Sequence, residues 1–179
     1  MIAGIKSFVE SNDTRPSWDE YYMSVAFLMS SRSPIRAKKV GAVIVQNNRI
    51  ISSGYNGFPA GLDYGSILVR DRELNTIHAE QNAIFNAARQ GVSIEGATMY
   101  STHEPCINCA KSIIASGITS VKYYYKYEVD ITNEPRHRMF LGSNVKLSSF
   151  NTLPDIPNCA CADCDHAKGC SSAPKCAKT

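Results

Sequence analysis

The stretch ATMYSTHEPCINCAKSIIASGITSVKYYY, residues 97–125, predicts a strand, a helix and a second strand in direct succession. The strands are expected at residues 97–102 and 120–125. Between them, the proline at position 105 suits the first turn of a helix, and Gly117 suits the end of that helix. A helix that connects two strands in this way is typical of α/β proteins.

The rest of the chain continues this alternation of helices and strands. Short strands at residues 40–45 and 49–55, joined by a polar turn, are expected to pair antiparallel. The other expected elements are a helix over residues 17–32, a loop over 56–66, a helix over 77–90, a short helix over 133–141 and a last strand over 144–150. This order favours an α/β sandwich in which helices cover a mixed sheet.

The composition indicates one globular domain with an appendage. The chain has 179 residues, of which 44% are hydrophobic and 20% are charged, and its net charge of +3 does not indicate a surface built for nucleic acid. No window reaches the roughly 18 apolar residues of a membrane span, and the first residues do not resemble a secretory leader. We therefore expect a cytoplasmic protein with a catalytic domain over residues 1–150 and a cysteine-rich tail over residues 151–179.

Two short motifs lie at the starts of two predicted helices. His78 and Glu80 begin one helix, and Cys106 and Cys109 lie in the first turn of the next. The exposed amides and partial positive charge of a helix N-terminus stabilise thiolates, the form of cysteine that binds metal. One histidine and two thiolates make a zinc site with its fourth position open, which is the catalytic rather than the structural pattern. Zinc in such a site acidifies a bound water.

The same residues allow other interpretations. Cys106 and Cys109 alone could be a redox pair, and Glu80 could be a first-turn carboxylate that the helix dipole favours. The combination of His-x-Glu with Pro-Cys-x-x-Cys, however, matches the signature of zinc-dependent nucleobase deaminases, in which the glutamate moves protons. We therefore interpret Glu80 as the catalytic acid and base, and His103 as a loop or pocket side chain rather than a metal ligand.

From about Ser17 to Tyr127 the chain resembles the deoxycytidylate (dCMP) deaminase family of the zinc-dependent cytidine deaminase superfamily. The resemblance rests on VGAVIV, GYNGFPAG, IHAEQNAI and GATMYSTHEPCINCAKSIIASGI. GYNGFPAG, residues 54–61, narrows the choice to dCMP deaminases among enzymes that share the zinc motif. The resemblance implies a cytidine-deaminase-like three-layer sandwich, with a mixed central sheet of about five strands flanked by helices.

The resemblance also implies hydrolytic deamination of dCMP to dUMP and ammonia, which supplies dUMP for thymidylate synthesis. By position, His78, Cys106 and Cys109 become the zinc ligands, and Glu80 becomes the proton shuttle. The substrate-binding residues become Asn56, Lys39, Arg36 and Tyr127. Two of these assignments have ordinary alternatives, because Asn-Gly is also a common turn and RAKK, residues 36–39, could be a solvated basic turn.

Many members of this family are homo-oligomers that nucleotides regulate. We therefore expect a homo-oligomer, with a hexamer favoured, activation by dCTP, inhibition by dTTP, and Mg²⁺ accompanying a bound nucleotide effector. The candidate effector residues are Tyr55, Gly57, Arg70 and Arg72.

The tail contains a second candidate metal site. Five cysteines and one histidine lie within eighteen residues, at Cys159, Cys161, Cys164, His166, Cys170 and Cys176. Any four of these side chains could hold a zinc ion. The alternative is a tail whose thiols bind nothing, because the Cys-x-Cys-x-x-Cys spacing matches no zinc module that we can name.

The nearest alternative function is deamination of another cytosine nucleotide, either dCTP or a modified dCMP. A deaminase of tRNA or single-stranded nucleic acid is less well supported, because the chain has no obvious basic stripe. A catalytically inactive zinc scaffold, whose tail contacts partners, is disfavoured by the presence of Glu80.

Overall fold

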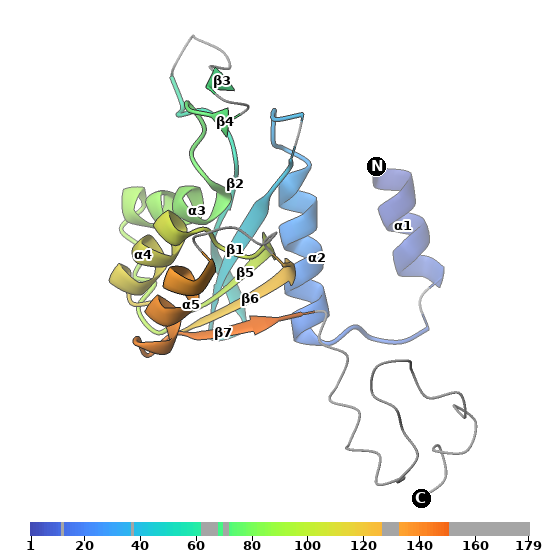
Figure 1. The fold of residues 1–179 in the computed structure, drawn as a ribbon. Coiled ribbons are helices and arrows are strands. Elements are labelled where there is room, and N and C mark those ends of the chain that lie inside the picture. The colour runs from blue at the N-terminus through green and yellow to red at the C-terminus, as the bar shows by residue number, and fades with distance from the viewer. Residues whose placement is uncertain (12, 37, 62–67, 70–71, 127–132, 151–179) are drawn as a thin grey trace, which may run out of the picture.

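The computed structural model describes residues 1–11, 13–36, 38–61, 68–69, 72–126 and 133–150 (Figure 1). In chain order its elements are α1 (Ile2–Ser11), α2 (Trp18–Ser30), β1 (Gly41–Gln46), β2 (Arg49–Tyr55), β3 (Leu68–Val69), β4 (Arg72–Glu73), α3 (Ala79–Arg89), β5 (Thr98–His103), α4 (Ile107–Ala115), β6 (Ser120–Tyr125), α5 (Asn133–Leu141) and β7 (Lys146–Ser149). The predicted strand, helix and strand of residues 97–125 are present as β5, α4 and β6.

Five of the strands form one mixed sheet in the order β2-β1-β5-β6-β7. β1 pairs antiparallel with β2 and β5, whereas β5, β6 and β7 run parallel to one another. The predicted antiparallel pair and the mixed sheet of five strands are therefore confirmed. The register brings Gly41, Tyr55, His103 and Tyr125 to the same end of the sheet, so the segments that follow β2 and β5 meet there.

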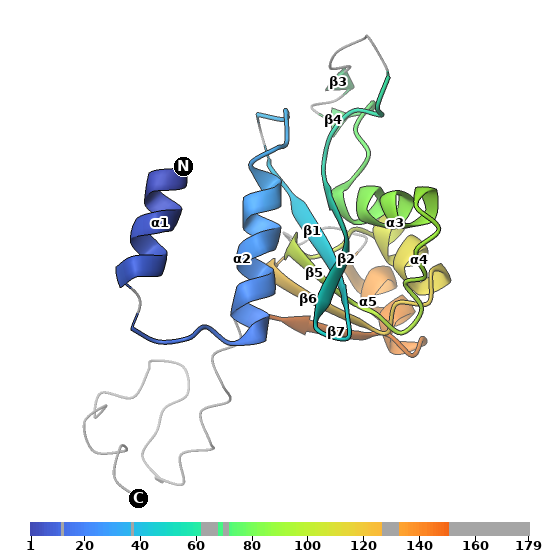
Figure 2. The ribbon, with the colours of Figure 1, turned by 180° about the vertical axis from the view of Figure 1, so that it is seen from behind.

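The sheet lies between two layers of helices (Figures 1 and 2). α3, α4 and α5 cover one face, where they pack against Ile44, Met99 and Val121. α2 covers the other face, where Tyr22 packs with Val43. Because successive side chains of a strand point to opposite faces, each strand supplies both cores. The expected three-layer sandwich is confirmed.

A glycine in β2 allows α3 to lie directly against the strand. A Cβ atom at Gly54 would come within 2.5 Å of the carbonyl oxygen of Ala79, in the first turn of α3. From the same helix, Asn82 donates its Nδ2 to the carbonyl of Tyr55 at 2.9 Å. The start of α3 is therefore held close to the end of β2.

The sequence did not predict two features. α1 contains no buried residue, and its apolar side chains Ile2, Phe8 and Val9 are all at least 60% exposed. α1 stands apart from the sheet and its covering helices in both views (Figures 1 and 2). β3 and β4 form a hairpin of two residue pairs. Strands of two residues, such as β3 and β4, carry too little hydrophobic periodicity to be recognised from sequence.

Two further predictions concern the tail of the chain and membrane-spanning segments. The last strand ends at Ser149, and the predicted tail over residues 151–179 lies outside the described residues. Within the described part of the chain, no helix is both long enough and apolar enough to cross a lipid bilayer.

Candidate active site

His78 and Cys106 occupy equivalent places at the starts of two neighbouring helices. His78 is the N-cap of α3 and Cys106 is the N-cap of α4, and both have extended backbone conformations. Neither side chain makes a capping hydrogen bond. Each helix begins two residues later than predicted, because the motif residue precedes the first helical residue. Cys109 lies inside the first turn of α4 and is fully buried.

These three side chains converge. Nδ1 of His78 lies 3.5 Å from Sγ of Cys106 and 3.4 Å from Sγ of Cys109, and all three atoms lie within 4.8 Å of one another. Ordinary zinc–nitrogen and zinc–sulfur bonds at a tetrahedral angle separate the two donors by about 3.6 Å. The donor set and its spacing therefore fit Zn²⁺. Among the residues that the structure describes, this is the one group of three potential ligands so arranged.

Contacts among the three candidate ligands favour the thiolate form of one cysteine. A hydrogen bond from the Cys109 thiol, and a further one from His78, lower the pKa of Cys106 to about 4. The same contact with Cys106, together with burial, raises the pKa of Cys109. The contact with Cys106 also raises the pKa of His78, the most exposed of the three. The thiolate, which is the form of cysteine that binds metal, is therefore favoured at Cys106.

Glu80 is buried beside this cluster, in the first turn of α3. It is 3% exposed, and burial raises the pKa of its carboxyl to about 7. A hydrogen bond from its own backbone N–H acts in the opposite direction, and the carboxyl also lies in contact with Cys109. A carboxyl whose pKa lies near neutrality can both accept and donate a proton at physiological pH.

Three of the four predicted substrate-binding residues fall in the described part of the chain. Asn56 follows β2 and is 8% exposed. Lys39 and Arg36 are exposed on the segment that precedes β1. Hydrogen bonds join Asn56 to this same segment, so the three residues lie at the end of the sheet where β2 stops and β1 starts. Tyr127 lies outside the described residues.

His103, the last residue of β5, does not belong to the metal cluster. Its Nδ1 lies 3.0 Å from Oγ1 of Thr102, and its ring centroid lies 5.0 Å from that of Tyr125. Burial and, to a smaller extent, the charge of Lys38 lower the pKa of His103 to about 4. Burial therefore favours the neutral imidazole, and the interpretation of His103 as a loop or pocket side chain stays a prediction.

The candidate effector residues are only partly described. Tyr55 ends β2, and Gly57 forms an isolated antiparallel bridge with Ile77, directly before His78. Arg72 is the first residue of β4, and Arg70 lies outside the described residues. The six candidate ligands of the tail also lie outside the described residues. The structure therefore brings Gly57 next to the residue before His78, describes Tyr55 and the backbone of Arg72, and does not describe Arg70 or the tail.

The sequence did not predict a buried ion pair next to the cluster. Glu104, two residues before Cys106, is 1% exposed, and its carboxylate lies 3.2 Å from the guanidinium of Arg136 on α5. Arg136 is fully buried, and Nε2 of His137 lies 2.8 Å from the same carboxylate oxygen. The acid beside the Pro-Cys motif is visible in the sequence. Its partner, more than thirty residues away, has no local signal.

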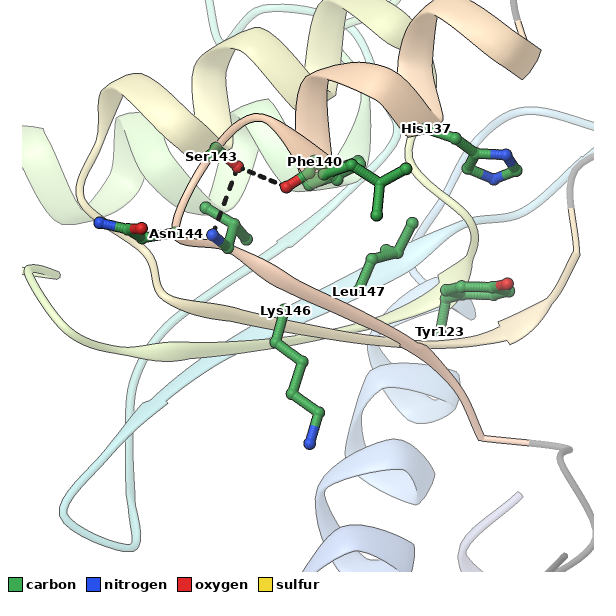
Figure 3. A pocket seen from close by; sticks show the side chains of 9 residues that line it. Tyr123, His137, Phe140, Ser143, Asn144, Lys146 and Leu147 are labelled. Atoms are coloured by element: carbon green, nitrogen blue, oxygen red, sulfur yellow. Dashed lines mark hydrogen bonds between the residues drawn. The ribbon is translucent and has the colours of Figure 1, made fainter.

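A surface pocket lies between α5 and β7, at the edge of the sheet opposite β2 (Figure 3). Tyr123, His137, Phe140 and Lys146 are among the residues that line it. None of the lining residues belongs to the metal cluster. We therefore assign this pocket no part in the chemistry.

Comparison with known proteins points to one family. A family model described as the cytidine and deoxycytidylate deaminase zinc-binding region matches residues 16–125. This region contains His78, Glu80, Cys106 and Cys109. The match therefore includes every member of the cluster and the buried carboxyl beside it.

Individual relatives agree with the family match. The chain is 44% identical over 118 residues to ComE operon protein 2 of Bacillus subtilis, covering 64% of this chain and 62% of that protein. It is 40% identical over 154 residues to the deoxycytidylate deaminase of Saccharomyces cerevisiae, covering 79% of this chain and 48% of that protein. The chain thus spans less than two thirds of the length of either relative.

A solved structure matches over nearly its whole length. It is the dCMP deaminase of the cyanophage S-TIM5 in complex with dCMP and dUMP, with a TM-score of 0.66 and 31% sequence identity. The match covers 76% of this chain and 98% of that chain. Both the sequence and the three-layer fold of this chain are therefore similar to those of deoxycytidylate deaminases.

Proposed function

The chain belongs to the family of cytidine and deoxycytidylate deaminases, and on this premise we propose that it catalyses the hydrolytic deamination of dCMP to dUMP and ammonia. The observation that carries the proposal is the arrangement of the site. A His-Cys-Cys cluster with zinc-like spacing lies beside the buried carboxyl of Glu80. The product dUMP would supply thymidylate synthesis.

The cluster would hold the metal. His78, Cys106 and Cys109 would bind Zn²⁺ through one nitrogen and two sulfurs, which leaves a fourth position open. Zinc bound there supplies an acidified water as the nucleophile. Cys109 is buried, Cys106 is partly buried and His78 is exposed, so the cluster lies near the surface on the side of His78.

Glu80 would carry the protons of the reaction. Its buried carboxyl can accept a proton from the attacking water, deliver one to the ring nitrogen of cytosine and later assist the departure of ammonia. Burial keeps competing water away and raises the pKa of this carboxyl to about 7, so both protonation states are accessible near neutral pH.

The substrate side of the site would be formed by the end of β2 and the segment before β1. Lys39 and Arg36 are exposed cations on that segment, and a cation beside a phosphate makes a strong charge-assisted hydrogen bond. We assign Asn56 to the same side of the site and Tyr127 to the closure of the pocket. The choice of dCMP is supported by the phage relative that was solved with dCMP and dUMP.

A substrate panel tests the proposal. The zinc-loaded protein should shift the ultraviolet spectrum of dCMP faster than that of CMP, dCTP, deoxycytidine or cytosine. The fastest turnover on dCTP or on a modified dCMP would replace the substrate but keep the chemistry. Turnover of single-stranded DNA or tRNA, with none of dCMP, would contradict the proposal.

Regulation and assembly extend the proposal. We assign activation to dCTP and inhibition to dTTP, with Mg²⁺ accompanying the bound nucleotide, near Tyr55, Gly57, Arg70 and Arg72. We also assign a homo-oligomeric state, with a hexamer favoured, and a cytoplasmic location. Repeating the panel with each nucleotide, with and without Mg²⁺, tests the regulation. Light scattering of the purified protein tests the assembly, and an unresponsive monomer would contradict both assignments.

The division of the chain at residue 150 and the tail metal site form a separate part of the proposal. Cys159, Cys161, Cys164, His166, Cys170 and Cys176 supply more than enough ligands for a second zinc ion. Zinc per chain should fall when the chain is truncated at Pro157. A content near one ion per chain before and after truncation would leave no metal in the tail.

A further inference from the structure

All four polar groups of Asn56 are directed at the segment before β1. The backbone N–H of Asn56 donates to the carbonyl of Val40 at 3.1 Å, and its own carbonyl accepts from the hydroxyl of Ser33 at 2.8 Å. The side-chain Oδ1 accepts from the N–H of Val40 at 2.8 Å, and Nδ2 donates to the carbonyl of Lys38 at 2.8 Å. Asn56 is 8% exposed, so these bonds are largely shielded from water.

The two side-chain bonds straddle Lys39. The carbonyl of Lys38 belongs to the peptide unit before Lys39, and the N–H of Val40 belongs to the peptide unit after it. One carboxamide therefore holds both peptide units that flank Lys39, in the way that a neighbouring strand would. The backbone direction of Lys39 is fixed while its side chain stays exposed to solvent.

The next residue reaches toward the metal ligands. Gly57 donates to the carbonyl of Ile77 at 3.1 Å and accepts from its N–H at 2.9 Å. Ile77 directly precedes His78. A Cβ atom at Gly57 would also be in van der Waals contact with Pro34, at 3.5 Å, in the segment that Asn56 holds. Asn56 and Gly57 thus connect the backbone of Lys39 to the backbone of a metal ligand through two short hydrogen-bonded links.

From this arrangement we infer that Asn56 is a positioning residue, which sets the place of the Lys39 ammonium relative to the metal ligands and thereby selects substrates that carry a 5′-phosphate. The inference rests on the proposed function, in which Lys39 meets the phosphate. It differs from a direct sugar or base contact by Asn56, because Asn56 would act through Lys39.

The two roles predict different dependence on the phosphate. A residue that touches the sugar or base contributes equally to dCMP and deoxycytidine. A residue that acts by positioning Lys39 contributes only when the phosphate is present. Hydrogen bonds to charged groups contribute about 1.5–3 kcal/mol, which corresponds to roughly a 10- to 100-fold change in rate or affinity.

The experiment compares Asn56→Ala, Lys39→Met and the double variant in the zinc-loaded full chain. Each single variant should lower kcat/KM for dCMP by roughly 10- to 100-fold, mainly through KM. The double variant should be no worse than Lys39→Met alone, because coupled residues are not additive. For deoxycytidine, all three should lose much less, so the ratio of kcat/KM for dCMP to that for deoxycytidine should fall by roughly 10- to 100-fold. Calorimetric binding of dUMP and deoxyuridine gives the same comparison independently of turnover.

Asn86→Ala is the matched control. Asn86 also donates its Nδ2 to a backbone carbonyl of β2, that of Ser53 at 2.9 Å, but it does not contact the segment of Lys39. It should lose some stability through the one broken hydrogen bond and leave the preference for dCMP over deoxycytidine unchanged.

Two outcomes would overturn the inference. Equal losses of dCMP and deoxycytidine in Asn56→Ala would indicate direct contact with the nucleoside, and multiplicative losses in the double variant would show that Asn56 and Lys39 act independently. Failure of the unmodified protein to deaminate dCMP would instead overturn the proposed function, so the two failures are distinguishable.

Discussion

Two buried carboxylates each lie two residues from a candidate metal ligand along the chain, and their surroundings differ. Glu80 follows His78 by two residues and is 3% exposed, whereas Glu104 precedes Cys106 by two residues and is 1% exposed. Glu104 is paired with the buried guanidinium of Arg136. Glu80 lies against a ligand sulfur, and its burial raises the pKa of its carboxyl to about 7.

The comparison shows that burial alone does not make a carboxylate reactive. A carboxylate beside a buried guanidinium has an opposite charge as its partner, and the pair ties two elements together, here the loop after β5 and helix α5. A buried carboxyl that is not neutralised in this way becomes easier to protonate, and this suits proton transfer. The first is suited to stability and the second to chemistry, although the two lie at similar chain distances from metal ligands.

Removal of zinc should have the largest effect. Chelation should abolish deamination, because without zinc the site has no acidified water to act as the nucleophile. The unfolding temperature should also fall, because a ligand that binds only the native state stabilises it. Activity and unfolding temperature are measured before and after zinc is returned. Full activity of verified metal-free protein would contradict the role of the cluster.

Glu80→Gln should come next. Loss of the acid and base should lower kcat by roughly 10²- to 10⁴-fold while the variant still binds zinc, as measured by steady-state kinetics and metal analysis. Glu104→Gln, at an equally buried carboxylate, is the control and should lose stability rather than turnover. Equal losses of turnover in the two variants would remove the distinction between the two carboxylates.

Arg136→Met should have a smaller effect on activity but a large effect on stability. Removing one member of a buried ion pair leaves the other charge uncompensated, at a cost of about 3–5 kcal/mol in the free energy of unfolding. Urea denaturation measures this loss. Arg138→Met, at an exposed position on the same helix, should change stability far less. A neutral effect of Arg136→Met would show that the pair with Glu104 contributes little.

The smallest effect is expected from a third carboxylate, Asp19 on α2. Its side chain is 44% exposed and pairs with Lys122, whose side chain is 31% exposed. Burial raises the pKa of Asp19, but hydrogen bonds from Lys122 and Tyr100 outweigh this, so the net pKa is lowered from 3.8. A pair this exposed contributes no more than about 1 kcal/mol.

The sign of its pH dependence follows from the lowered pKa. The folded state favours the charged form of Asp19, so the stabilisation is present above pH 3.8 and is lost as the pH falls through the lower pKa of the folded state. Unfolding of the unmodified protein and of Asp19→Asn, compared at neutral pH and below pH 3.8, should show a gap that closes in acid. A gap that widens in acid would contradict the assignment.

The sequence predicted most of the fold because its signals are local. Gly117, the proline at position 105 and the alternation of β-branched runs with helical segments act within a few residues of the boundaries they mark. These signals located β5, α4 and β6 closely, and α5 over its full length. The sequence did not predict three elements. α1 buries nothing, and β3 and β4 are too short to show a period.

For the candidate site, the sequence predicted residue types but not their surroundings. The sequence assigned His78, Cys106 and Cys109 to one metal site, and the structure places their donor atoms within 4.8 Å of one another. The partners of Glu104 and of Asn56 were not predicted. Arg136 and the segment around Lys39 meet them only after distant parts of the chain have packed together.

The sequence by itself determined the kinds of chemistry available, since spacing along a chain specifies which ligands begin neighbouring helices and which strands can pair. Only the tertiary structure decided how those groups behave. The burial that raises the pKa of Glu80, the guanidinium that neutralises Glu104 and the carboxamide that straddles Lys39 all depend on contacts between residues far apart in the chain. Burial and electrostatic environment belong to the packed molecule, and no local pattern of residues encodes them.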